Sequence, residues 1–169
     1  MNDDFDALMA RTDPTMVIVT TAAGEERSGC LVGFHCQCSI EPPRLAVWLS
    51  KANHTHLVGA RADTFAVHWV PSGRHDLAEL FGGATGDEVD KLARCGWTAG
   101  PDGVPVLDDC PDLVIGHRIA WLDVDTDHSC LVLEPIEARS GTETSGWLRL
   151  SDADDIEPGH AAQERQPPA

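Results

Sequence analysis

The sequence predicts a mainly β protein, an antiparallel barrel that carries a few short helices. Short apolar runs rich in β-branched residues recur along the chain, and 15 Gly and 11 Pro are scattered between them, which is typical of many strands joined by turns. The predicted strands outnumber the helices and do not alternate with them, which argues against a parallel doubly wound sheet. No Gly-x-Gly-x-x-Gly motif follows a strand, so a Rossmann dinucleotide site has no support.

The first third of the chain is expected to form one short helix and three strands. The helix covers residues 5–11, and an aspartate before it is able to cap its start. The strands are expected over residues 16–21, 27–34 and 45–49. A turn at residues 23–25 joins the first two strands, and Pro42 and Pro43 form a rigid corner that the third strand follows.

The rest of the chain is expected to contain both helices and strands. Helices are expected over residues 53–60, 75–81 and 87–94. Strands are expected over residues 64–70, 113–124, 130–137 and 146–150, with a Gly/Pro loop at 100–105. In the longest strand, alternation places one set of apolar side chains on a single face. This set is Leu113, Ile115, Ile119 and Trp121. We expect residues 1–138 to form the domain and residues 139–169 a C-terminal extension, which is a loose tail from residue 151 because its composition is acidic and then rich in Gln, Pro and Ala.

Composition excludes several classes of function. A length of 169 residues indicates a single domain, and a hydrophobic content of 42% is enough for a real core. The net charge of −16 argues against binding to nucleic acid, which rests on clustered Lys and Arg, and against an anionic membrane surface. No apolar run reaches the roughly 18 residues of a membrane span, and the acidic N-terminus lacks a signal-peptide pattern. The sequence therefore predicts a cytoplasmic protein with small-molecule partners.

The six cysteines are expected to be free and to act mainly as small packing residues, Cys36 and Cys38 included. The run His35-Cys36-Gln37-Cys38 does not predict a metal site. In a strand the two cysteines share one face while His35 points to the other. A Cys-x-Cys spacing also lacks the second ligand pair of a zinc site. We therefore expect no structural metal.

Residues 50–55 are the segment most suited to an anionic ligand, because they end a predicted buried strand and begin a predicted helix. A helix start exposes unpaired backbone N–H groups and the positive end of the helix dipole, and Lys51 adds a full charge. A flat, phosphorylated cofactor is expected to lie along residues 29–39 with its phosphate on residues 50–55. In the alternative interpretation, Lys51 is a solvated charge, and Asn53 and Thr55 are plain helix caps.

Between residues 5 and 138 the chain contains, in this order, TDPTMVIVTT, GCLVGFHCQCSIEPPRLAVWLSK, SKANHTHLV, FAVHWV, DLAELFGG, DEVDKL, GVPVL and DHSCLVLEPIEA. This order of motifs resembles the flavin reductase-like family, FMN-binding split β-barrels that work as homodimers. In that family the second segment reads Gly-x-Thr-Val-Ser-Ser-Phe-x-Ser-Val-Ser-x-x-Pro-Pro, and the third is a helix start rich in Ser and Thr. The resemblance implies a dimeric split β-barrel with a few short helices.

The resemblance also implies which residues hold a flavin. The implied contacts with the isoalloxazine ring or the ribityl chain are Val32, Gly33, Phe34, Gln37, Cys38 and Ser39. The implied phosphate contacts are Ser50, Lys51, Asn53 and Thr55. Lys91 is implied to reach the flavin from the Asp-Lys segment. His128 is the implied catalytic residue, since it stands on the dimethylbenzene or nicotinamide side and is able to position the nicotinamide or protonate the product.

The implied activity is reduction of FMN, or FAD, by NAD(P)H, with the reduced flavin supplied to a partner monooxygenase. The chain departs from the family at residues 31–34, where Leu-Val-Gly-Phe replaces Thr-Val-Ser-Ser and hydroxyl groups are missing. Two alternatives therefore stay open. One is a split-barrel oxidoreductase that retains a flavin or deazaflavin and acts on a small organic substrate. The other is a non-enzymatic protein that binds flavin, or binds haem through His35, His68 or His128.

Overall fold

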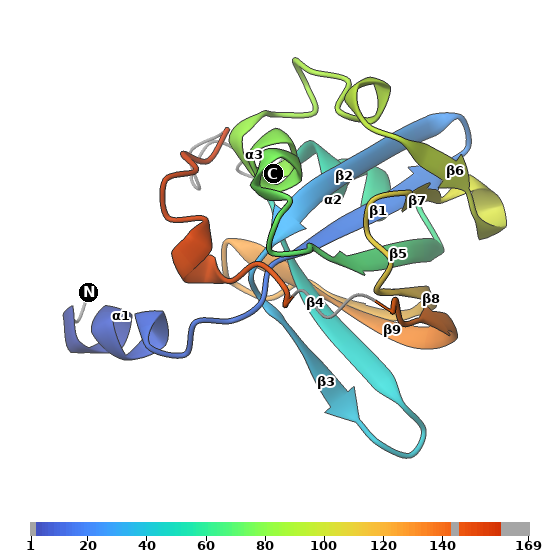
Figure 1. Cartoon of the computed structure of the whole chain (residues 1–169). Coiled ribbons are helices and arrows are strands. Elements are labelled where there is room, and N and C mark those ends of the chain that lie inside the picture. Colours follow the sequence, from blue (N-terminus) through green and yellow to red (C-terminus); the bar gives the residue numbers. More distant parts are fainter. Residues whose placement is uncertain (1–2, 143–145, 160–169) are drawn as a thin grey trace.

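The computed structural model describes residues 3–142 and 146–159 as a curled antiparallel sheet with helices at its edges and over one face (Figure 1). The main sheet has seven strands in the order β2-β1-β5-β8-β9-β4-β3, and all its pairs are antiparallel. These strands are β1 (Val17–Ala23), β2 (Glu26–Val32), β3 (His35–Ser39), β4 (Arg44–Ser50), β5 (Thr64–Trp69), β8 (Leu113–Leu122) and β9 (His128–Arg139). The predicted mainly β, antiparallel class is confirmed.

The remaining elements are short. The α-helices are α1 (Asp3–Ala10), α2 (His54–Gly59) and α3 (His75–Gly83). A second, two-stranded sheet pairs β6 (Trp97–Ala99) with β7 (Pro105–Leu107). The 3-10 turns are η1 (Leu92–Arg94), η2 (Pro101–Gly103) and η3 (Leu150–Asp152). None of the helices in the described part of the chain is long and apolar enough to cross a membrane.

Strand β1 is buried on both of its faces, which explains why its sequence is a continuous apolar run rather than an alternating one. Val17 and Val19 point into the curled sheet, where they pack with the inner residues of β4, β5 and β9. Ile18 points to the outer face and packs beneath α3 with Leu77 and Phe81. Two apolar layers therefore share one strand, and α3 is fixed to the outside of the barrel.

The long strand β8 does not keep the single apolar face that alternation predicts. Its pairing with β9 shifts register between Ile115 and Gly116 and again between Arg118 and Ala120. The first shift leaves Ile136 of β9 without an opposite residue, and the second leaves Ile119 of β8 without one. Leu113 and Ile115 are buried as expected, but Ile119 is 49% exposed, so the prediction for Ile119 is wrong.

Several short elements also differ from the sequence prediction. Residues 87–94 do not form a helix, because only Leu92–Arg94 makes a 3-10 turn. In this segment the side chains of Thr85 and Asp90 accept hydrogen bonds from the backbone N–H groups of Asp87 and Ala93, which competes with helical bonding. The loop at 100–105 closes the β6–β7 hairpin instead of standing alone. Strand β3 is an additional strand, and its Cys36 and Cys38 are exposed rather than packed.

The C-terminal segment is packed where the sequence predicts a loose tail. Residues 146–150 make isolated bridges to Thr15 and Pro71 rather than a strand. Beyond them, Ala153 is buried and Ile156 packs against the layer under α3. The backbone N–H of Gly159 donates to the carbonyl of Gly82 over 3.2 Å. The expected tail is therefore wrong for residues 151–159, and its last part, residues 160–169, lies outside the described residues.

His68 on β5 is fully buried and links three strands. Its Nδ1 lies 3.0 Å from the carbonyl oxygen of Ile18 on β1, and its Nε2 accepts a hydrogen bond from the backbone N–H of Leu107 on β7 over 3.1 Å. The ring is therefore neutral, with its proton on Nδ1. Because both nitrogens are used and the ring has no exposed surface, His68 is excluded as a haem ligand.

We predict that His68 makes the fold sensitive to acid. Burial lowers the pKa of His68 from 6.5 to about 4. Since the folded state disfavours the charged ring, this stabilisation is complete above pH 6.5 and is lost as the pH falls towards 4, at a cost on the order of 3 kcal/mol. An NMR titration of the ring protons measures this pKa directly. His75 is an internal reference because the Asp155 carboxylate raises its pKa, and a His68 ring that titrates above His75 contradicts the assignment.

Candidate functional site

A cavity of about 350 Å³ lies where the ends of β2, β4 and α3 meet the start of β9. Most of its wall is apolar, and its polar groups come from the ends of strands and the start of α2. It is lined by Met16, Leu31, Val32, Gly33, Phe34, Trp48, Ser50, Asn53, Phe81, Gly82, His128, Leu150, Ala153, Ile156 and Pro158. A flat apolar ring system with a polar side chain fits such a lining.

Phe34 and His128 form an aromatic pair at this cavity. Their ring centroids are 5.3 Å apart and their planes are tilted by 60°. Phe34 remains 59% exposed, so the described part of the chain leaves its ring open to solvent. His128 Nδ1 lies 2.8 Å from the Asp127 carboxylate, and this hydrogen bond lowers the pKa of Asp127. Nδ1 therefore carries a proton, which leaves Nε2 as the ring nitrogen with a lone pair when His128 is neutral.

Gly33 gives the cavity a stretch of bare backbone. A Cβ placed on Gly33 would meet only the flexible Met16 side chain, with its nearest atom 3.5 Å away. The fold therefore does not require glycine here. Gly33 and Met16 both line the cavity. Because Gly33 has no side chain, a ligand is able to approach its backbone closely.

The structure brings six of the sequence-predicted residues to this cavity and places the others elsewhere. The six are Val32, Gly33, Phe34, Ser50, Asn53 and His128. The register of β4 and β9 pairs Ser50 with His128, so these two come from adjacent strands on one face of the sheet. The resemblance to the family implies all six, and they stand at strand ends or just after them.

Gln37, Cys38 and Ser39 lie along the edge strand β3, away from the cavity. The Gln37 side-chain amide donates to the backbone carbonyl of Ser39 over 3.1 Å. Gln37 lines a separate pocket of about 420 Å³, together with His35 and Trp69. Gln37, Cys38 and Ser39 therefore do not belong to the wall that Gly33 and His128 share.

Lys51 and Thr55 also point away from the cavity. The Lys51 ammonium lies 2.6 Å from the Asp123 carboxylate and donates to the carbonyl of Val124 over 2.9 Å. The Thr55 hydroxyl is buried and lies 2.8 Å from the Ser28 hydroxyl. Both side chains fix α2 to neighbouring strands and loops.

The cavity wall includes one segment that sequence reasoning misses. Leu150, Ala153, Ile156 and Pro158 come from the C-terminal segment, which crosses α3 and closes one side of the cavity. The segment is acidic and lacks strand or helix periodicity, so the sequence contains no local signal for this role.

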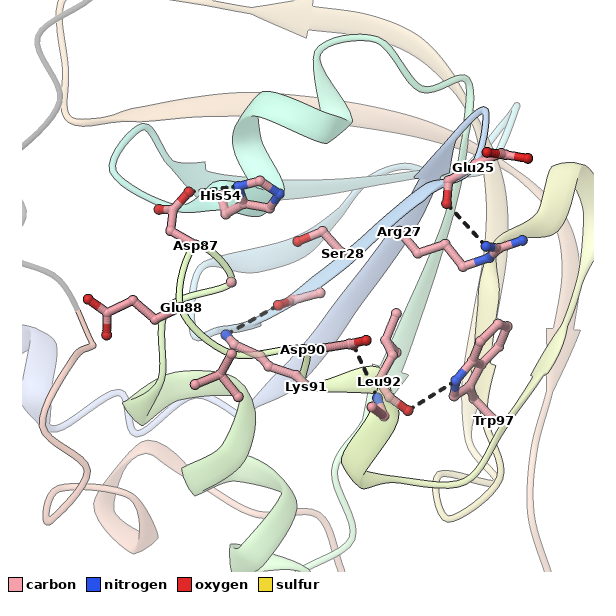
Figure 2. A pocket seen from close by; sticks show the side chains of 14 residues that line it. Glu25, Arg27, Ser28, His54, Asp87, Glu88, Asp90, Lys91, Leu92 and Trp97 are labelled. Carbon is pink, nitrogen blue, oxygen red and sulfur yellow. Dashed lines mark hydrogen bonds and ion pairs between the residues drawn. The ribbon is translucent and has the colours of Figure 1, made fainter.

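A second pocket, of about 460 Å³, is charged and lies on the other side of the α2 start (Figure 2). It is lined by Glu25, Arg27, Ser28, Gly29, His54, Gly86, Asp87, Glu88, Val89, Asp90, Lys91, Leu92, Ala93 and Trp97. Lys91 is 5% exposed, and its ammonium donates to the carbonyls of Phe81 over 2.8 Å and Gly29 over 3.4 Å. Burial lowers the pKa of Lys91.

His54, the first residue of α2, bridges two carboxylates in this pocket. Its Nε2 lies 3.1 Å from Glu26 and its Nδ1 lies 2.9 Å from Asp87. Both ring nitrogens of His54 therefore face carboxylate oxygens. Arg61 also pairs with Glu26 and is the main cause of its lowered pKa. His54 thereby ties the loop before Lys91 to β2.

Comparisons with known proteins agree with this geometry. The family model described as flavin reductase like domain matches residues 9–149. The FMN reductase (NADH) RutF of Ancylobacter novellus is 33% identical over 144 residues, which cover 85% of this chain and 78% of that protein. The RutF of Stutzerimonas stutzeri is 30% identical over 108 residues, covering 64% of this chain and 62% of that protein. The chain thus spans only about three fifths of that relative's length.

A solved structure shows the same fold. The NADH:FAD oxidoreductase SgcE6 of Streptomyces globisporus superposes with a TM-score of 0.76 at 22% identity, covering 90% of this chain and 93% of that one. The split β-barrel expected from the sequence is confirmed.

We predict that the two lysines of the chain differ in their contribution to stability. Lys91→Met removes the donor that satisfies the Phe81 carbonyl near the end of α3, which costs about 1–3 kcal/mol in the free energy of unfolding. Lys51→Met breaks an ion pair that is open to solvent on the Asp123 side and costs less than about 1 kcal/mol. Urea denaturation of the two variants measures both values. Equal costs would show that Lys91 is not held as a buried cation.

Proposed function

The chain belongs to the flavin reductase-like domain family, and from this membership and the cavity we propose that it is an NAD(P)H-dependent flavin reductase. The observation that carries the proposal is the 350 Å³ cavity, which gathers the family-implied flavin residues Gly33, Phe34 and His128 in one wall. Relatives named FMN reductase (NADH) support FMN and NADH as the substrates.

The cavity fits the ring end of a flavin. An isoalloxazine is flat and mainly apolar, with polar atoms along one edge. The apolar walls from β2, α3 and the C-terminal segment exclude water from its faces, and bare backbone at Gly33 allows close approach. In this proposal Val32, Gly33 and Phe34 contact the ring, and Ser50 and Asn53 contact the ribityl chain.

A bound flavin accepts hydride from a reduced nicotinamide and passes the electrons on, and it supplies the redox chemistry itself. The protein residues then have two tasks, to orient the rings and to manage protons. Phe34 offers an exposed aromatic face beside the cavity on which a nicotinamide is able to stack. His128 is proposed to hold or deliver a proton there through Nε2, while Asp127 fixes the ring at Nδ1.

A homodimer is the proposed assembly. Helix α1 stands away from the body and buries none of its residues, although Phe5, Leu8 and Met9 are apolar (Figure 1). The β3–β4 hairpin also projects from the sheet and carries Ile40, which is 83% exposed (Figure 1). Exposed apolar surface of this kind supports an interface. We further propose a cytoplasmic location, in keeping with six free cysteines, and a flavin-dependent monooxygenase as the consumer of reduced flavin.

The direct test of the proposed function is oxidation of NADH or NADPH by the purified protein with added FMN, followed through the loss of nicotinamide absorbance. We expect turnover that depends on both flavin and protein. The absorbance spectrum of the protein as purified separates a retained flavin or deazaflavin from a flavin that enters as substrate. Absence of turnover with FMN, FAD and riboflavin would contradict the proposal.

We predict that Gly33→Val blocks the flavin site without harming the fold. The new side chain enters the cavity, so the dissociation constant for flavin should rise at least about tenfold, or about 1.4 kcal/mol. The melting temperature should change by less than about 2 °C, since the only near neighbour is the flexible Met16. Fluorescence titration and thermal unfolding measure the two effects.

Gly73→Val is the matched control, because a Cβ at Gly73 has no neighbour within 4 Å and Gly73 does not line the cavity. We expect this variant to bind flavin as the parent protein does. If Gly33→Val also binds flavin normally, the ring lies elsewhere.

A further inference from the structure

The start of α2 separates the apolar cavity from the charged pocket. Asn53 lines the cavity and His54, the next residue, lines the charged pocket. Under the proposed function, a ribityl chain that leaves the cavity past Asn53 brings its end towards His54. The charges around His54 therefore decide how the site receives a phosphate.

The cationic groups near the α2 start already have anionic or carbonyl partners within the chain. His54 lies between Glu26 and Asp87, and Figure 2 draws its contact with Asp87. Lys51 is paired with Asp123 at 2.6 Å. Lys91 is buried and bonded to two backbone carbonyls, one of which is drawn in Figure 2.

Carboxylates dominate the remainder of the charged pocket. Glu25, Asp87, Glu88 and Asp90 line it. Arg27 is the only guanidinium among the lining residues, and it lies at the end opposite His54 in Figure 2. There it stacks on Trp97, 5.5 Å from the ring centroid, and bonds to the backbone carbonyls of Glu25 and Gly103.

The ring end of a flavin fits this chain, but a phosphate end does not. A phosphate monoester carries about −1.5 to −2 charges near neutral pH. It would have to displace Glu26 or Asp87 from His54 while facing further carboxylates, in a protein whose net charge is −16. Such a contact gives little net attraction, because forming one ion pair breaks another.

We propose that this site recognises flavins by the isoalloxazine ring and not by the phosphate, so that it binds riboflavin at least as well as FMN. The carboxylates of Glu26 and Asp87, which occupy His54, are the specificity-determining groups. The proposal rests on the proposed function, since it concerns the same cavity and the same class of ligand.

The test is a pair of fluorescence-quenching titrations of the full chain, one with riboflavin and one with FMN, at low and at high salt. We expect the dissociation constant for FMN to equal or exceed that for riboflavin, and added salt to leave FMN binding unchanged or to strengthen it. FMN that binds more than about tenfold tighter than riboflavin, with salt weakening it, overturns the proposal and reveals a cationic phosphate site.

Substitution of carboxylates tests which of them disfavour the phosphate of FMN. Glu26→Gln combined with Asp87→Asn leaves the His54 ring without its two carboxylate partners, so the affinity for FMN relative to riboflavin should rise about fivefold or more. Glu88→Gln removes a pocket charge without touching the His54 bridge, and a smaller change in the same direction is expected. Glu79→Gln removes an exposed charge that does not line this pocket and is the matched control.

An FMN-to-riboflavin ratio that stays constant in the double variant and in Glu88→Gln overturns the assignment to these carboxylates. The outcomes also distinguish a failure of this inference from a failure of the proposed function. A protein that binds and reduces FMN but strongly prefers it over riboflavin keeps the proposed function and loses this inference. A protein that binds neither flavin loses both.

Discussion

The burial of β1 on both faces is the constraint on which the rest of the structure depends. Its inward side chains fill the curled sheet, and Ile18 on the outer side anchors α3. His68 adds a directional link, because its ring joins the Ile18 carbonyl to the N–H of Leu107 in the small sheet. Once α3 is fixed over this strand, Phe81 and Gly82 come to the wall of the cavity. The site is therefore a consequence of how two apolar layers share one strand.

The sequence predicts the elements whose signal is local. Strands β1, β4 and β5 are short apolar runs bounded by turns, and each is found within a few residues of the expected place. The failures occur where side-chain hydrogen bonds or contacts with other elements decide the structure. Hydrogen bonds to the side chains of Thr85 and Asp90 replace the helix expected at 87–94, and the bulge in β8 leaves Ile119 at the surface. The segment 151–159 looks unstructured in isolation and is ordered by contacts with α3.

In the candidate site, too, some residues could be predicted from the sequence and others could not. Residues such as Gly33 and Ser50 stand at strand ends, where the sequence alone indicates a wall, and the structure brings them together. Lys51 looks like a phosphate ligand because it is a rare cation beside a helix start, and the resemblance implies that Lys91 reaches the flavin. Their partners, Asp123 and the Phe81 carbonyl, are far from them along the chain or hidden in a turn of helix. Because the partners of the two lysines are not their neighbours in the sequence, the sequence does not show that these ammonium groups are already paired. The motif therefore suggests more charge available to a ligand than the structure provides.

The pairing of the cations near His54 bears on function if the protein holds the flavin through the isoalloxazine ring alone. A flavin reductase that supplies another enzyme must release its product, and every strong phosphate contact slows that release. In this chain the hydroxyl groups typical of the family are missing at residues 31–34 and the cations near His54 are already paired. In the proposed mode of binding, the missing hydroxyl groups and the paired cations both weaken the polar hold and leave apolar burial, which is present for flavins with and without phosphate. Both features therefore favour a flavin that exchanges readily with solvent over one that stays bound.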